Sequence, residues 1–174
     1  MSDTYYVKTF GGLEITNDNV TVNIVELFGK QLVNLLQVLL FHSEKPVQKD
    51  ELIDILWPES KNPSSALKFS IFRLRAELNE IEFFKDKEVI VTTRKGYILN
   101  PNLDWNIDFV ELEKAYNQIN DGSELLDEKE FKTARKIFRL YQGRFYASPS
   151  QLHWILQKQE IFRQMYVKTM MRTS

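Results

Sequence analysis

The sequence of 174 residues contains no cysteine and only two histidines, so it has few side chains suited to metal binding or nucleophilic chemistry. The absence of cysteine excludes disulfides, thiolate nucleophiles and thiolate metal sites, and it is consistent with an intracellular protein. His42 and His153 lie far apart in the sequence, and neither belongs to a local cluster of ligands such as zinc requires. We therefore expect no metal site and no bound cofactor.

Long apolar runs and phosphate-binding loops are also missing. The longest apolar stretch, LVNLLQVLLF, is far shorter than the roughly 20 residues that span a membrane, and MSDTYYVKTF does not resemble a secretory signal. A cytoplasmic location without a membrane partner is the expectation. FGG at 10–12 lacks the further glycines and the lysine of a phosphate-binding loop. Acidic pairs such as Asp50 with Asp54, or Asp108 with Glu111, have the spacing of solvated helix faces, so no enzyme is expected.

Positive charge is scarce overall but locally concentrated. The formal net charge is -1, which argues against a protein that coats nucleic acid through bulk positive charge. Residues 1–60 carry 4 Lys and Arg against 9 Asp and Glu, residues 61–100 carry 8 against 5, and residues 101–174 carry 11 against 10. The middle segment is the only clearly basic one, so an electrostatic footprint for nucleic acid is expected there.

Hydrophobic periodicity predicts a mixed α and β structure in the first hundred residues. Five segments are expected to be regular: antiparallel β-structure over 5–15 and 20–27, and helices over 30–42, 48–57 and 64–79. Pro46 and Pro58 end the first two helices, since proline cannot continue a helix. Ser64 and Ser65 are the expected caps of the third helix.

A basic hairpin and a helical region follow. The segment EVIVTTRKGYILN predicts two strands joined by a tight turn, in which Gly96 provides the backbone freedom. NPNLDWN interrupts this pattern, so we place a domain boundary near residue 101, between domains 1–101 and 102–174. Beyond it, apolar spacing predicts three helices, in the segments DFVELEKAYNQIN, DEKEFKTARKIFRLYQG and LHWILQKQEIFRQMYVKTMM. Gly122 and Gly143 stand where helices should end.

The helix predicted over 64–78, SSALKFSIFRLRAEL, has two unlike faces. Its inward stripe consists of Leu67, Ile71, Leu74 and Leu78. The opposite side carries Ser65, Phe69, Phe72, Arg73 and Ala76, with Lys68 and Arg75 toward one flank. A DNA major groove admits one α-helix whose outer side chains reach the base edges, so this face is a candidate DNA-binding surface.

The order of these elements is that of a winged helix-turn-helix. KPVQKDELIDILWP, LRAEL and TTRKGYIL resemble the effector domain of OmpR/PhoB-type response regulators, which also begins with a β-sheet, and FGGLEI resembles part of that sheet. DFVELEKAY, ARKIFRLYQGRFYA and HWILQKQEIFRQMYVKTM resemble the bacterial transcriptional activator domain of SARP-type regulators. The expected fold is therefore an α+β winged helix followed by an all-α, TPR-like segment. The family's helical domain is usually longer, so 102–174 is expected to be truncated.

The resemblance implies a sequence-specific regulator of transcription, expected to be an activator, that binds double-stranded DNA as a homodimer on direct repeats. It implies that helix 64–78 enters the major groove while the wing, 92–97, reaches the adjacent minor groove or backbone. The expected DNA-binding residues are Ser65, Lys68, Phe69, Phe72, Arg73, Arg75, Arg94 and Lys95. Phe72 departs from the family, whose members often carry a cation there. The loop 58–63 corresponds to a segment that can contact RNA polymerase, and a plain connector is the alternative.

Individual roles follow from side-chain chemistry. Arg73 is expected to donate to guanine, Phe69 and Phe72 to lie against thymine methyls, and Lys68 and Arg75 to contact phosphates. The alternative for the two phenylalanines is packing against the wing or the helical domain. The rival function is a protein-interaction module whose winged helix no longer binds DNA, which the near-neutral charge favours. A TPR-like scaffold alone does not account for the first hundred residues.

Overall fold

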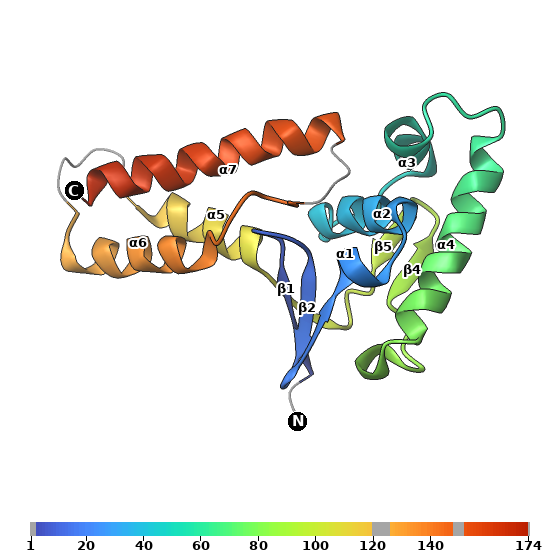
Figure 1. Ribbon diagram of the computed structural model, residues 1–174, viewed down its shortest axis with the longest axis horizontal. Coiled ribbons are helices and arrows are strands. Elements are labelled where there is room, and N and C mark those ends of the chain that lie inside the picture. The colour runs from blue at the N-terminus through green and yellow to red at the C-terminus, as the bar shows by residue number, and fades with distance from the viewer. Residues whose placement is uncertain (1–2, 120–125, 148–151, 174) are drawn as a thin grey trace. The chain divides into compact units, whose positions relative to one another are not determined.

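The computed structural model describes residues 3–119, 126–147 and 152–173, and its chain divides into two compact units (Figure 1). One unit comprises residues 24–104, and the other comprises residues 1–23 together with 105–174. The division near residue 104 lies close to the boundary that we predicted at 101. However, the first 23 residues group with the C-terminal helices and not with the helices and hairpin that follow them.

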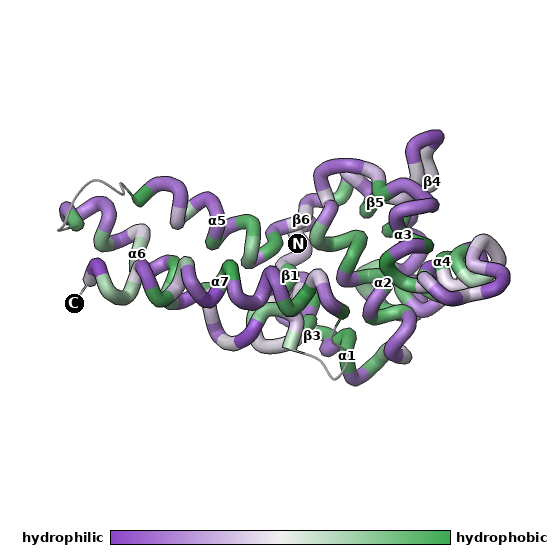
Figure 2. The backbone as a smooth tube through the Cα atoms, turned by 90° about the horizontal axis from the view of Figure 1, so that it is seen from above, coloured by the Kyte–Doolittle hydropathy of each residue, from purple (hydrophilic) through white to green (hydrophobic). Residues whose placement is uncertain are grey.

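The unit formed by residues 24–104 contains the three predicted helices and the hairpin, but the expectation of β-structure over 20–27 is wrong for 24–27, which form a short helix. Its elements are α1 (Ile24–Leu27), α2 (Lys30–Phe41), α3 (Lys49–Leu56), α4 (Pro63–Asn79), the 3-10 turn η1 (Glu82–Phe84), β4 (Ile90–Thr93) and β5 (Gly96–Leu99). α2 is buried from Leu32 to Leu40, and Figure 2 shows it as a mostly hydrophobic tube. α2 contacts α1, α3, α4 and β5, so it is the central helix of this unit.

The longest helix of this unit, α4, begins earlier than its serines suggested. Asn62 is its N-cap residue and Pro63 occupies the first turn, so the prediction that Ser64 or Ser65 caps the helix is wrong. Proline suits this position because its fixed φ matches the helix and its missing N–H would have had no intrahelical partner. The predicted inward stripe is confirmed, since its four residues are at most 2% exposed: Leu67, Ile71, Leu74 and Leu78.

The hairpin is fastened to the segment between α2 and α3 at the start of β5, next to the turn. β4 and β5 are antiparallel, with Thr93 opposite Gly96. Val47 and Tyr97 exchange two backbone hydrogen bonds, of 2.8 and 3.0 Å. Gly96 has a φ of +136°, and a Cβ atom there would lie 1.9 Å from the carbonyl oxygen of Val47. Only glycine fits this close approach, which holds the start of β5 against Val47 immediately beside the turn.

The second unit combines a sheet with three helices. Its strands are β1 (Thr4–Lys8), β2 (Glu14–Asn17), β3 (Val20–Asn23) and β6 (Asp104–Ile107), in the order β3-β2-β1-β6. Its helices are α5 (Asp108–Gln118), α6 (Glu128–Leu140) and α7 (His153–Arg172), as the apolar spacing predicted. The expectation that NPNLDWN is irregular is wrong for its last residues. Trp105 packs against Tyr5, with ring centroids 5.4 Å apart, and β6 lies beside β1.

The helices of this unit carry clear local signals. Asp127 and Glu130 form a capping box at the start of α6, in which the carboxylate of Asp127 accepts the backbone N–H of Glu130 at 2.7 Å. Gly143 follows the end of α6, whereas Gly122 lies outside the described residues. Within the part of the chain that the structure describes, no helix combines the length and the apolar content needed to cross a bilayer.

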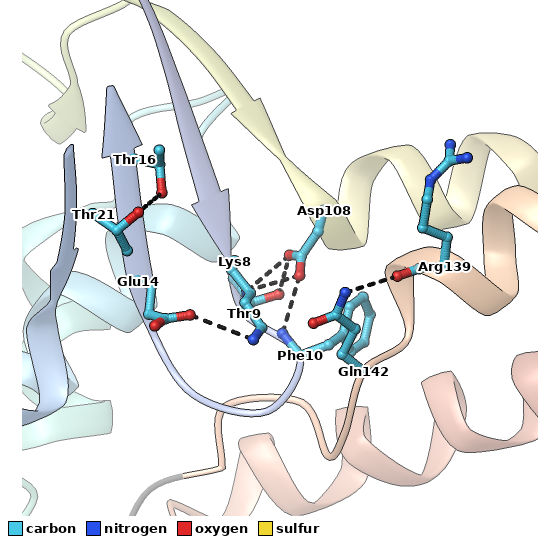
Figure 3. A network of polar contacts seen from close by, with 9 residues as sticks. All are labelled: Lys8, Thr9, Phe10, Glu14, Thr16, Thr21, Asp108, Arg139 and Gln142. Atoms are coloured by element: carbon cyan, nitrogen blue, oxygen red, sulfur yellow. Dashed lines mark hydrogen bonds and ion pairs between the residues drawn. The ribbon is translucent and has the colours of Figure 1, made fainter. Parts of the chain in front are cut away.

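Asp108, the first residue of α5, joins the N-terminal strands to the C-terminal helices (Figure 3). Its carboxylate accepts the backbone N–H of Thr9 at 2.9 Å, the Thr9 hydroxyl, and the backbone N–H of Phe10 at 3.1 Å. The side chain is buried, so the prediction that it belongs to a solvated face is wrong. Burial raises the pKa of Asp108, and the hydrogen bonds from Thr9 and Phe10 oppose that rise.

An aromatic cluster lies next to this carboxylate. The ring centroid of Phe10 is 5.3 Å from that of Phe162 and 5.9 Å from that of Phe145, and Phe109 is 5.6 Å from Phe145. Phe10 and Phe109 directly follow the two polar partners, Thr9 and Asp108. The hydrogen bonds therefore fix the backbone positions from which these rings enter the core.

Replacing Asp108 should destabilise the second unit. In Asp108→Asn an amide N–H group faces the N–H groups of Thr9 and Phe10, which leaves buried donors unpaired, so we expect the free energy of unfolding to fall by roughly 2 to 4 kcal/mol. Urea unfolding followed by near-UV circular dichroism measures the change. Glu128→Gln, at an exposed position in the first turn of α6, is the control and should change the value by less than about 0.5 kcal/mol. Equal stability of both variants would contradict a joining role for Asp108.

Candidate nucleic-acid interface

The outward face of α4 is open to solvent. Phe69 is 62% exposed and Phe72 is 70% exposed, while the side chain of Arg73 is 50% exposed. With this much of each ring exposed, neither phenylalanine is a buried residue, as packing against the wing or the helical domain, the alternative that the sequence left open, would require. Ser65, Lys68 and the short side chain of Ala76 are exposed on the same helix. The rotation of α4 that buries its apolar stripe therefore presents two aromatic rings and a guanidinium outward.

Arg75 does not point outward with the other cations. Its Nε and Nη2 atoms donate to the carbonyl oxygen of Ile90 at 3.2 and 3.0 Å, and Nη2 also donates to the hydroxyl of Thr92 at 2.7 Å. Ile90 and Thr92 belong to β4, so this side chain braces the helix against the hairpin. Phosphate contact by Arg75 remains a prediction, because in the free protein its Nε and Nη2 atoms already donate to β4.

Tyr97 completes the junction between helix and wing. The guanidinium carbon of Arg75 lies 6.0 Å from the centroid of its ring, and Nζ of Lys49 lies 5.9 Å from it. Both distances are within the range of cation–π attraction between a positive charge and an aromatic ring, so Lys49 and Arg75 both interact favourably with Tyr97. Sequence reasoning identified Tyr97 only as a strand residue, because the partner positions lie 22 and 48 residues away in the chain.

Arg73 lies on the opposite flank of the outward face. Its guanidinium carbon is 5.8 Å from the ring centroid of Phe69, and Nη2 is 3.6 Å from Oε1 of Glu77. An exposed ion pair of this length contributes less than about 1 kcal/mol, so the guanidinium can exchange this carboxylate for another acceptor. A cavity of about 430 Å³ opens on this flank, lined among others by Lys30, Trp57, Phe69 and Arg73. It leaves Arg73 room to reorient.

The wing carries its charge at the tip. Arg94 and Lys95 are both exposed between β4 and β5. The hydroxyl of Thr93 accepts the backbone N–H of Lys95 at 3.1 Å and donates to the carbonyl oxygen of Gly96 at 3.0 Å. These bonds hold the backbone of the turn, so the two cationic side chains project from a fixed base.

Positive charge at these positions is local, because the unit as a whole is not basic. Residues 24–104 contain 11 Lys and Arg against 12 Asp and Glu. Many of the acidic residues lie in and just after α3, including Asp50, Glu51, Asp54 and Glu59. Seven of the eight predicted DNA-binding residues are exposed on α4 or on the wing, and Arg75 is the exception. Their contact with DNA is a prediction that the geometry permits.

Comparison with known proteins gave a family and two solved structures. A family model described as "Transcriptional regulatory protein, C terminal" matches residues 23–99. The chain is similar to Mycobacterium tuberculosis EmbR in complex with a low affinity phosphopeptide, with a TM-score of 0.63, 17% identity, and coverage of 96% of this chain and 43% of that chain. It also matches the DNA-binding domain of E. coli CadC, with a TM-score of 0.41, 25% identity, and coverage of 53% and 87%. The search of curated proteins gave no match.

The likeness to EmbR concerns the fold. It extends over nearly the whole of this chain, which confirms the predicted winged helix followed by a helical segment. The chain spans less than half of the length of that EmbR chain. The family match runs from the last residue of β3 to the end of β5, which includes every residue of the candidate interface.

Removing the Arg75 brace should loosen the wing. In Arg75→Ala the carbonyl of Ile90 and the hydroxyl of Thr92 lose their donor, and we expect the backbone amides of β4 and β5 to exchange hydrogen about 5- to 10-fold faster, equivalent to about 1 kcal/mol. Hydrogen exchange followed by NMR measures this. Lys68→Ala, two turns earlier on the same helix and exposed, is the matched control, and its protection should be unchanged. Identical exchange in both variants would show that Arg75 does not hold the wing.

Proposed function

Because residues 23–99 carry the winged-helix domain of OmpR/PhoB-type transcriptional regulators, we propose that this chain binds double-stranded DNA in a sequence-specific manner and regulates transcription. α4 lies in the major groove, and the wing, 92–97, reaches the adjacent minor groove or backbone. The observation that carries the proposal is the exposure of Phe69, Phe72 and Arg73 on the face opposite the buried stripe. A regulator of this kind acts in the cytoplasm.

Each exposed side chain has a role that its chemistry allows. Arg73 donates two hydrogen bonds to one guanine, since a guanidinium matches the O6 and N7 acceptors on its major-groove edge. Lys68, Arg94 and Lys95 contact phosphates, which position the helix without reading sequence. Ser65, in the first turn of α4, donates to a phosphate near the start of the helix. Arg75 contacts phosphate only through donors that its bonds to β4 leave available.

The loop between α3 and α4 extends the proposal to activation. Residues 58–62 are exposed, and they lie in the connection between α3 and the proposed DNA-contacting helix α4. We propose that this loop contacts RNA polymerase while two copies of the chain occupy direct repeats. In vitro transcription with Glu59→Ala/Lys61→Ala checks the idea: DNA affinity should stay within about 2-fold of the unmodified protein while promoter activation falls severalfold. Unchanged activation would leave the loop as a connector.

The rival function is a protein-interaction module whose winged helix does not bind DNA. The near-neutral charge of the unit and its exposed phenylalanines both support it. The unit 24–104 has a formal net charge of -1, and two exposed phenylalanines would suit a protein interface as well as a groove. A protein-interaction module would not be retained on duplex DNA. A DNA-binding protein should be retained, and its affinity should fall with salt as counterions return to the phosphates.

Two arginine substitutions test the DNA-binding surface. We expect Arg73→Ala to weaken binding to a duplex selected by the unmodified protein by about 10- to 100-fold, because one bidentate base contact is lost. Arg94→Ala should weaken binding less, about 3- to 10-fold, and reduce the slope of log affinity against log salt by about 1. Mobility-shift titrations at several salt concentrations measure both. Arg135→Ala, at an exposed position of α6, is the matched control. Wild-type affinity in both variants would exclude this face.

A further inference from the structure

The two phenylalanines of α4 are exposed to an unusual degree. Phe72 and Phe69 are 70% and 62% exposed, and the next most exposed aromatic side chains among the described residues are Tyr6 at 51% and Phe131 at 41%. A phenyl ring in water is unfavourable compared with the same ring against an apolar surface. Both rings therefore favour a bound state in which some apolar group covers them.

The rise between the two rings is of the same order as the distance between stacked bases. Phe69 and Phe72 are three residues apart, so they lie on one side of the helix and about 4.5 Å apart along its axis. Successive bases of one DNA strand are about 3.4 Å apart along the duplex axis. A helix lying in the major groove would thus bring the two rings to neighbouring base pairs.

The chemistry of a phenyl ring limits what it can recognise on a base edge. It has no hydrogen-bond donor or acceptor for the nitrogen and oxygen atoms that line the major groove, and the apolar group exposed there is the C5 methyl of thymine. Resting on the proposed function, we propose that α4 recognises duplex DNA through the C5 methyl groups of two thymines in neighbouring base pairs. Phe69 and Phe72 supply the contacts.

Arg73 extends this contact to an adjacent base. Its guanidinium carbon lies 5.8 Å from the ring centroid of Phe69, and its pair with Glu77 is long and exposed. Its donors therefore start beside the ring and can move to a guanine next to a thymine that the ring covers. The recognised element is then a short stretch in which methyl groups and one guanine occupy neighbouring positions of the groove.

Other parts of α4 do not compete for these methyl groups. Arg75 is turned toward β4, and Lys68 lies on that same flank. Ala76 lies on the outward face one turn beyond Phe72, but its single methyl covers little area. The two rings are therefore the main apolar contacts that this helix can make in a groove.

The test changes the DNA and keeps the protein intact. A duplex is selected by the full chain from a random pool and is synthesised again with deoxyuridine in place of thymidine, one position at a time, which removes only the methyl group. Burial of one methyl corresponds to about a 4-fold gain in affinity, so one contacted substitution should weaken binding about 4-fold and two should weaken it about 15-fold. Restoring the methyl by 5-methylcytosine in a cytosine-substituted duplex should recover about 4-fold.

Protein variants assign the methyl contacts to the rings. In Phe69→Ala and Phe72→Ala, the affinities for the thymine duplex and the corresponding uracil duplex should differ by less than 2-fold, because the ring that sensed the methyl is gone. Phe131→Ala, at another exposed phenylalanine on α6, should keep the full difference. Circular dichroism confirms that each variant is folded.

Three outcomes separate this inference from the proposed function. Weaker binding to uracil duplexes that disappears in the two α4 variants supports the methyl contact. Tight and selective binding with no difference between thymine and uracil, or a difference that persists in both variants, overturns the inference and leaves DNA binding standing. Failure to select any duplex overturns the proposed function, and the inference with it.

Discussion

Burial of the leucine-rich stripe of α4 sets the orientation on which the interface depends. Leu67, Ile71, Leu74 and Leu78 are at most 2% exposed, and α4 contacts α2 and α3. Burying a side chain of this size contributes roughly 1.5 to 3 kcal/mol, so rotating the helix by one position would forfeit several such contributions. The outward direction of Phe69, Phe72 and Arg73 is therefore a consequence of packing on the other side of the helix.

A second constraint fixes where the wing stands relative to that helix. Arg75 bonds to β4, the ring of Tyr97 lies under two cations, and Gly96 lies against the backbone at Val47. These contacts join α4, the hairpin and the segment before α3 within one compact unit. A DNA-binding surface built from a helix and a wing needs such a junction. The helix and the wing must contact adjacent parts of the duplex at the same time, so their relative position has to be fixed.

How much of this follows from sequence depends on the distance between the partners. The stripe of α4 and the amphipathic helices were predictable because spacings of three and four are local. Asp108 looked like one carboxylate of a solvated face, because its partners Thr9 and Phe10 are 98 or more residues away. β6 was missed for the same reason, since its pairing with β1 crosses the whole winged helix. Similarly, the sequence placed Arg75 with the phosphate contacts, and only its bonds to Ile90 and Thr92 show the brace.

The charge of the winged-helix unit bears on how it would bind DNA. With 11 cations against 12 anions, long-range attraction to DNA would contribute little, and the proposed phosphate contacts rest mainly on three exposed cations, Lys68, Arg94 and Lys95. Nonspecific binding rests almost entirely on such contacts, whereas apolar and bidentate contacts to base edges depend on sequence. A helix with phenylalanine in place of a cationic residue at positions 69 and 72 therefore loses more affinity for nonspecific DNA than for its specific site. If the unit binds DNA as proposed, the ratio of specific to nonspecific affinity should be larger than for a more cationic helix of the same fold.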